Sequence, residues 1–224
     1  MSRGMIGIAS GDQMRYSQIL SSIMGISWPE GTVFSQTVGF SVATNWNIIA
    51  KQFLSHPDNL EWLLLLEDDH LFPANTLMCL LKHNVDIVSA LYVQRLIPFA
   101  PVMYDRVDEK GKVFYRPLKK GDSGLVAVNV CGGGCCLIRR KVFEAISPPW
   151  WFYGESSYLD ACNHDINFCR KARAAGFQPY VDLDLPISHM ITIGAIPFKD
   201  KDGIWHTRLE QGDKNITVGA AQYD

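Results

Sequence analysis

The sequence predicts a single α/β domain in which a mixed, mostly parallel central sheet is flanked by helices. Short apolar runs of the length of buried strands alternate with segments whose apolar residues recur at helical spacing. The chain has 224 residues, 47% of them hydrophobic and 20% charged, which is enough to bury one substantial core. One apolar run ends in three adjacent carboxylates, at the position where open α/β sheets bind their ligands.

The first half of the chain follows this alternation. Residues 5–9 form an apolar run typical of a strand, and Tyr16, Ile19 and Ile23 then recur at the spacing of a helix. A second helix is predicted at residues 42–54, and it must end before Pro57 because the residue preceding a proline disfavours helical geometry. Further strands are predicted at residues 31–38, 62–66 and 86–92, and a further helix at residues 75–82.

The second half continues the pattern and closes the sheet. The helix predicted at residues 163–175 is capped by Asn163 and ends at Gly176. We expect the domain to span residues 1–196, and the polar tail 197–224 to form a mobile loop over the site. The other expected elements are a hairpin at 98–105 and 112–115, a strand at 125–130, one element at 137–143, and closing strands at 181–185 and 187–190.

Charge and cysteine usage narrow the class of protein. A net charge of −2 argues against a protein that coats nucleic acid. The six cysteines lack the spacing of a disulfide framework, which indicates a reducing, cytoplasmic location. The apolar segment at the N-terminus is too short for a signal peptide, and no stretch approaches the ~18 apolar residues that a membrane span needs.

Three carboxylates follow the strand predicted at residues 62–66. Glu67, Asp68 and Asp69 are adjacent, and a divalent cation would offset their mutual repulsion. Carboxylate oxygens suit a hard ion such as Mg²⁺ or Mn²⁺, and such an ion is most useful when the substrate carries a diphosphate. The alternative is that the three acids form a solvated turn after a core strand.

Four motifs occur in an order that resembles a known family. They lie at residues 43–45 (ATN), 66–70 (LEDDH), 132–140 (GGGCCLIRR) and 164–172 (HDINFCRKA). Over residues 5–190 the chain resembles the GT-A-fold nucleotide-sugar glycosyltransferases of the family 2 type. The resemblance implies a Rossmann-like GT-A domain.

The resemblance also implies a metal site and a donor site. Glu67 and Asp69 stand at the outer positions of the family's Asp-x-Asp motif, and His189 stands where many such enzymes place a second metal ligand. His206 is the fallback for that ligand, and His70 is a weaker ligand candidate, for which capping of the following turn is favoured. The residues implied in donor binding are Ser10, Asp12, Asn45, Glu67 and Asp68.

A catalytic base and an acceptor site are implied in the same way. Asp165 matches the second acid of the family's Glu-Asp pair, which deprotonates the acceptor hydroxyl in inverting members, and His164 replaces the first acid. The alternative for Asp165 is an acid that serves only the helix dipole. The residues implied in acceptor binding are Gly133, Gly134, Trp151, Tyr153 and His164. For the glycines, the alternative is a tight turn that needs positive φ; for the aromatic residues, it is a lid that packs on the core.

These observations favour a metal-dependent glycosyltransferase that moves a sugar from a UDP- or GDP-linked donor to an acceptor hydroxyl, with Mn²⁺ or Mg²⁺ as cofactor. The acceptor is not readable from the sequence. One alternative is a phage-type DNA glycosyltransferase acting on hydroxymethylated pyrimidines in modified DNA. The others are a nucleotidyltransferase, for which residues 10–15 make a poor phosphate loop, and a non-catalytic protein that binds sugar nucleotides.

Overall fold

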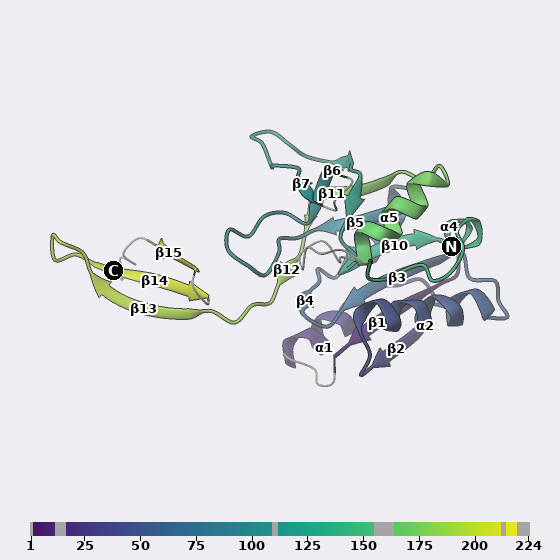
Figure 1. Ribbon diagram of the computed structural model, residues 1–224. Coiled ribbons are helices and arrows are strands. Elements are labelled where there is room, and N and C mark those ends of the chain that lie inside the picture. The colour runs from purple at the N-terminus through teal and green to yellow at the C-terminus, as the bar shows by residue number, and fades with distance from the viewer. Residues whose placement is uncertain (1, 12–16, 109–111, 155–163, 212–213, 219–224) are drawn as a thin grey trace.

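The computed structural model describes residues 2–11, 17–108, 112–154, 164–211 and 214–218. Its main feature is a seven-stranded sheet in the order β2-β1-β3-β10-β5-β11-β8 (Figure 1). Neighbouring strands are parallel except at β10 and β8, which run antiparallel to their neighbours, so the predicted mixed, mostly parallel sheet is confirmed. The strands are β1 (Gly4–Ser10), β2 (Val33–Val38), β3 (Trp62–Glu67), β5 (Ile87–Leu91), β8 (Leu125–Ala127), β10 (Cys135–Arg139) and β11 (Pro179–Pro186).

Helices cover both faces of this sheet, and β3 is buried between them. Leu63 and Leu65 point into a cluster shared with the second, fourth and fifth helices, whereas Leu64 and Leu66 point into a cluster shared with the first and third. Burial on both faces explains why β3 is a continuous apolar run instead of an alternating one. The helices are α1 (Ser17–Met24), α2 (Val42–Ser55), α3 (Thr76–Lys82), α4 (Arg140–Ala145) and α5 (His164–Ala174).

Local signals set the ends of α2. The Ser41 hydroxyl accepts a hydrogen bond from the Thr44 N–H at 3.3 Å, which caps the first turn. His56 is extended immediately before Pro57, as predicted. The segment 137–143, expected as one element, is instead divided between β10 and α4.

Two small sheets lie beside the main one. The predicted hairpin is confirmed as β6 (Met103–Val107) paired with β7 (Val113–Tyr115), and β9 (Val130–Cys131) pairs with the other edge of β6. The two-residue strand β4 (His70–Leu71) pairs with β12 (Ser188–His189). The closing strand expected at 187–190 is therefore shorter than predicted.

The polar tail was predicted as a loop, and that prediction is wrong for most of its length. Strands β13 (Gly194–Lys199), β14 (Trp205–Gln211) and β15 (Lys214–Val218) form an antiparallel sheet that stands away from the main body (Figure 1). The polar composition conceals an alternation of period two in β14, where Trp205, Thr207 and Leu209 share one face.

In the part of the chain that the structure describes, we find no helix that combines the length and the apolar character needed to cross a bilayer. The five described cysteines are free thiols.

Candidate metal centre and catalytic site

The ends of several strands meet at one edge of the main sheet. The parallel strands β1, β3 and β5 end there, and the antiparallel β10 begins there after Gly134. Beyond the end of β3, the pairing of β4 with β12 sets His70 directly opposite His189. Their rings stack with centroids 4.2 Å apart, and the Met190 N–H donates to the Asp69 carbonyl at 2.7 Å. Two short strands therefore join motifs that lie more than a hundred residues apart in the sequence.

Asp69, His70 and His189 form a group of potential metal ligands. One ligand atom from each lies within 4.8 Å of the others. Asp69 Oδ1 is 2.9 Å from His70 Nδ1, and Asp69 Oδ2 is 3.4 Å from His189 Nε2. The structure therefore brings together Asp69 and His189, which the family resemblance implied as ligands, and adds His70, for which capping of the turn was favoured over ligation.

Hydrogen bonding decides how His189 faces Asp69. Its Nδ1 donates to the Val93 carbonyl at 2.7 Å, which leaves Nε2 as the ring nitrogen that faces Asp69. A backbone carbonyl on the far nitrogen is the usual support of a histidine that ligates a metal.

Most atoms of this group make no well-formed hydrogen bond, although Asp69 Oδ2 pairs with Arg95. Within the described residues, Asp69 Oδ1, both ring nitrogens of His70 and Nε2 of His189 are buried and make no hydrogen bond of acceptable geometry. Buried polar atoms that crowd together in this way are unfavourable unless a proton or a cation lies between them. Burial disfavours ionisation of Asp69, but the adjacent imidazoles outweigh it and hold the pKa of this carboxyl well below its usual range. This donor set fits a divalent cation.

The segment after β5 completes the site, and sequence reasoning missed it. Arg95 Nη1 lies 3.1 Å from Asp69 Oδ2. The Tyr92 hydroxyl accepts a hydrogen bond from the Gly134 N–H at 3.0 Å, and its ring meets that of His70 edge-on with centroids 4.6 Å apart. The sequence could have indicated these residues by their position, because they follow a strand that ends at the same edge of the sheet as the acids.

Glu67 and Asp68 lie beside the group of Asp69, His70 and His189 without being members of it. Glu67, predicted as a ligand, is not a member of the group, and burial together with the charges of Asp69 and Asp165 raises its pKa well above the usual value. Asp68 Oδ2 accepts a hydrogen bond from the Gly11 N–H at 3.1 Å, which ties the acid motif to the turn after β1.

The three glycines at residues 132–134 are required by close packing of the site's own side chains. None has a positive φ, so a tight turn of that kind does not account for them, and all three are buried. An added Cβ would meet Tyr92 at Gly132, Trp46 and Asp165 at Gly133, and His70 and Glu67 at Gly134. The glycines therefore bring two carboxylates and an imidazole around one stretch of backbone.

Asp165 lies in the first turn of α5, close to Gly133, whereas Glu67 lies close to Gly134. Burial raises the pKa of its carboxyl, and His164 and the Gly133 N–H partly oppose that shift. His164 Nε2 is 3.6 Å from Asp165 Oδ1. A buried carboxyl with a raised pKa and an oriented neighbour is a reasonable proton acceptor.

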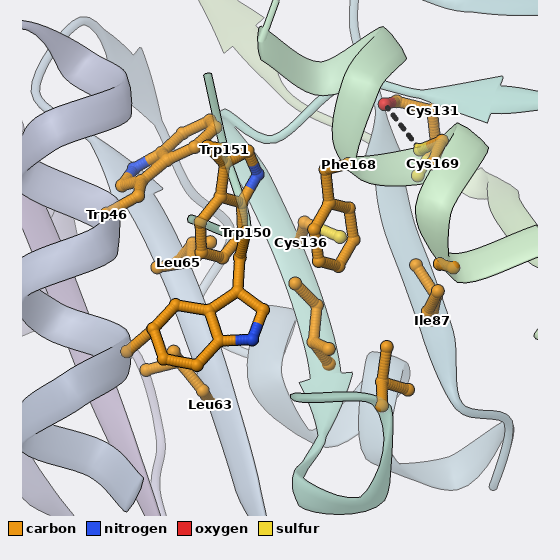
Figure 2. Close-up of a cluster of buried hydrophobic side chains, with 14 of the residues drawn as sticks. Trp46, Leu63, Leu65, Ile87, Cys131, Cys136, Trp150, Trp151, Phe168 and Cys169 are labelled. Atoms are coloured by element: carbon orange, nitrogen blue, oxygen red, sulfur yellow. Dashed lines mark hydrogen bonds between the residues drawn. The ribbon is translucent and has the colours of Figure 1, made fainter. Parts of the chain in front are cut away.

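The aromatic residues expected to bind the acceptor divide into two groups. Trp151 is buried and stacked on Phe168 with centroids 4.7 Å apart, so in this structure it is part of the core and offers no face to a sugar (Figure 2). Tyr153 is 49% exposed and packs against His164, which in turn contacts Trp46. Tyr153 and His164 therefore remain the side-chain candidates for contact with an acceptor.

The remaining donor candidates surround the end of β1. Asn45 Nδ2 donates to the carbonyls of Ser10 and Phe40, both at 3.2 Å, and among the described residues its Oδ1 is buried without a partner. Asp12 lies outside the described residues, as does Asn163. His206 pairs with Asp200 at 2.8 Å in the C-terminal sheet and belongs to no metal group found in the described part.

The fold and the site together define an α/β protein with a histidine–carboxylate centre at the carboxyl edge of a mixed sheet. No family model matches the chain, and no curated protein matches it either. A197 from STIV, known from a crystal structure, is similar in fold, with a TM-score of 0.60 and 17% sequence identity over 99% of this chain and 100% of A197.

Two weaker structural likenesses involve transferases. One is the inositol-1-phosphate CTP transferase from T. maritima, at a TM-score of 0.42 and 12% identity over 84% of this chain and 89% of that protein. The other is a glycosyltransferase involved in the glycosylation of the major capsid of PBCV-1, at 0.32 and 12% identity over 65% of this chain and 68% of that one. Likenesses this low carry no weight for function, which must be argued from the site.

Proposed function

We propose that this protein is a metal-dependent glycosyltransferase that moves a sugar from a nucleoside-diphosphate sugar to an acceptor hydroxyl. The observation that carries the proposal is the buried group of Asp69, His70 and His189 at the carboxyl edge of the sheet, whose ligand atoms lie close together and mostly lack well-formed hydrogen bonds. Two imidazoles and one carboxylate suit Mn²⁺ better than Mg²⁺, although either is a candidate.

The chain's own residues suggest how the donor is held. When bound, the cation would supply positive charge against the diphosphate of the leaving nucleotide. Ser10, Asn45 and Asp68 lie around the end of β1, beside the acid motif, and Asp12 follows in the sequence. We place the UDP or GDP part of the donor there. Burial and the neighbouring carboxylates raise the pKa of Glu67, so this side chain is the acid of the motif least suited to holding a charge beside the diphosphate.

Asp165 is the proposed base of an inverting reaction. It would accept the proton of the acceptor hydroxyl, while the Gly133 N–H and His164 orient its carboxylate. The closeness of Asp165 to Gly133 and of Glu67 to Gly134 supports placing this base near the acid motif. Tyr153 would line the acceptor side.

Mn²⁺ binding followed by electron paramagnetic resonance tests the metal centre directly. Asp69→Ala should abolish binding, and His189→Ala should weaken it by about 10- to 100-fold, because each removes a ligand or its support. His83→Ala is the matched control, since this histidine pairs with Asp182 away from the site. Equal Mn²⁺ affinity in all four proteins would reject the centre.

The reaction class is tested by a donor screen. Nucleoside-diphosphate release from UDP- and GDP-sugars with Mn²⁺ should require Asp69 and should rise when a suitable acceptor is added. Release of pyrophosphate from a nucleoside triphosphate would instead indicate a nucleotidyltransferase, and donor binding without turnover would indicate a non-catalytic protein. Oligonucleotides with hydroxymethylated pyrimidines belong in the acceptor panel.

A further inference from the structure

Arg95 competes for the oxygen on which the proposed cation would sit. Its Nη1 is 3.1 Å from Asp69 Oδ2, the same oxygen that His189 Nε2 approaches at 3.4 Å. The Arg95 side chain is 45% exposed, whereas that of Asp69 is 8% exposed. One end of this ion pair is therefore buried in the site, and the other reaches solvent.

The backbone around Arg95 is held by the C-terminal sheet. Gln211 Nε2 donates to the Arg95 carbonyl at 2.8 Å, and Gln211 Oε1 accepts from the Ile97 N–H at 3.3 Å. Lys214 Nζ donates to the Ile97 carbonyl at 3.1 Å. These contacts join β14 and β15 to the segment after β5 and restrain its main chain, so the Arg95 side chain can change partner without movement of the loop.

We infer that Arg95 is a diphosphate-binding residue of this site, which pairs with Asp69 until the donor enters and then transfers to the phosphate oxygens. The inference rests on the proposed function. A guanidinium on Asp69 and a divalent cation on the same carboxylate would place two positive charges together, so binding of the cation favours release of Arg95. The released guanidinium has the planar fork that suits phosphate oxygens.

This exchange couples the two ligands. A diphosphate that takes up Arg95 frees Asp69 for the cation, and the cation in turn frees Arg95 for the diphosphate, so each ligand raises the affinity for the other. Arg95 should then affect the two affinities in opposite directions. If Arg95 only stabilised the fold, its replacement would instead lower both affinities.

The experiment measures both affinities in the parent, Arg95→Gln, Arg95→Lys and Arg116→Gln. Arg116 is the matched control because it is a partly exposed arginine paired with Asp105 at 3.5 Å outside the site. Without nucleotide, Arg95→Gln should bind Mn²⁺ about two- to fivefold more tightly by electron paramagnetic resonance, as expected for loss of a half-exposed competing ion pair. By calorimetry at saturating Mn²⁺, its affinity for UDP or GDP should fall about 10- to 100-fold. Arg95→Lys should fall between, and Arg116→Gln should match the parent.

The outcomes separate the two proposals. If the parent binds Mn²⁺ and nucleotide but Arg95→Gln binds both as the parent does, or loses both affinities together, Arg95 is structural and this inference is wrong while the metal centre stands. If the parent binds no Mn²⁺, or binds neither UDP nor GDP, the proposed function fails and the role of Arg95 fails with it.

Discussion

Asp165 is the residue on which the reaction depends most directly. Asp165→Asn keeps the shape of the side chain but removes its ability to take a proton, so turnover should fall about 10²–10⁴-fold once a donor and an acceptor are known. Donor affinity should stay close to that of the parent. Because burial raises the pKa of Asp165, parent activity should increase with pH through that raised value. Near-normal turnover of the variant would remove Asp165 from the mechanism.

The same carboxyl should make stability depend on pH. The pKa of Asp165 is higher in the folded protein than its usual value of 3.8, so the folded state binds more protons than the unfolded state between the two values. The free energy of unfolding contributed by Asp165 is therefore largest at low pH and decreases as pH rises from the usual value through the raised one. Above the raised pKa, the buried carboxylate of Asp165 is charged, and its full desolvation cost lowers the free energy of unfolding.

Asp165→Asn removes this cost. Urea unfolding from about pH 4 to about pH 7.5, with EDTA present, should show the variant gaining stability over the parent as pH rises. His164 and Glu67 are the titratable neighbours nearest this carboxyl, and both are retained in the variant. A stability difference that does not change with pH would mean that Asp165 titrates normally in the folded protein.

At the residue level, the family resemblance implied Asp69 and His189 as metal ligands, and the structure places them 3.4 Å apart. Their role as ligands stays a prediction. Arg95 and Tyr92 were missed because nothing in a lone arginine or tyrosine shows which strand end it follows until the sheet order is known. Trp151 was read as an exposed stacking surface because sequence alone cannot show which side of an aromatic loop is covered.

At the level of elements, the glycine run before β10 links the sheet to the site. At Gly133 an added Cβ would lie 2.9 Å from Asp165 Oδ1 and even closer to the Trp46 ring. Gly133→Ala should therefore destabilise the protein by about 1–3 kcal/mol in urea unfolding, because buried side chains must move to admit the methyl group. Gly194→Ala is the control, since the nearest atom to an added Cβ there is 3.7 Å away. Equal stability of the two variants would contradict this packing.

Most strands and helices of the main sheet were predictable because their hydrophobic period is strong. The apolar run at 62–66 and the segment 42–54 became β3 and α2 with small changes at their ends. The β4–β12 pair was not predictable as a unit, since two-residue strands leave no periodic signal and their partners are far apart in the sequence. The C-terminal sheet was missed because a polar composition outweighed its alternation.

At the level of the whole molecule, the sheet order brings the strand ends together at one edge, and the residues that follow those strands supply the side chains of the site. Parallel strands end at one edge, so residues from β1, β3, the segment after β5 and α5 converge there. The likeness to A197 from STIV covers nearly the whole chain and shows the fold alone. Function therefore depends on whether the converging side chains hold a metal ion.

A crystal of the protein grown with MnCl₂ and UDP, measured at the manganese absorption edge, tests that claim most directly. We predict a single strong anomalous peak in contact with Asp69 Oδ2 and His189 Nε2, with His70 beside it, and the Arg95 guanidinium turned from Asp69 to the diphosphate. An anomalous map with no peak between Asp69 and His189, with the Asp69–Arg95 ion pair intact and UDP bound elsewhere or absent, would contradict the metal centre and the function proposed from it.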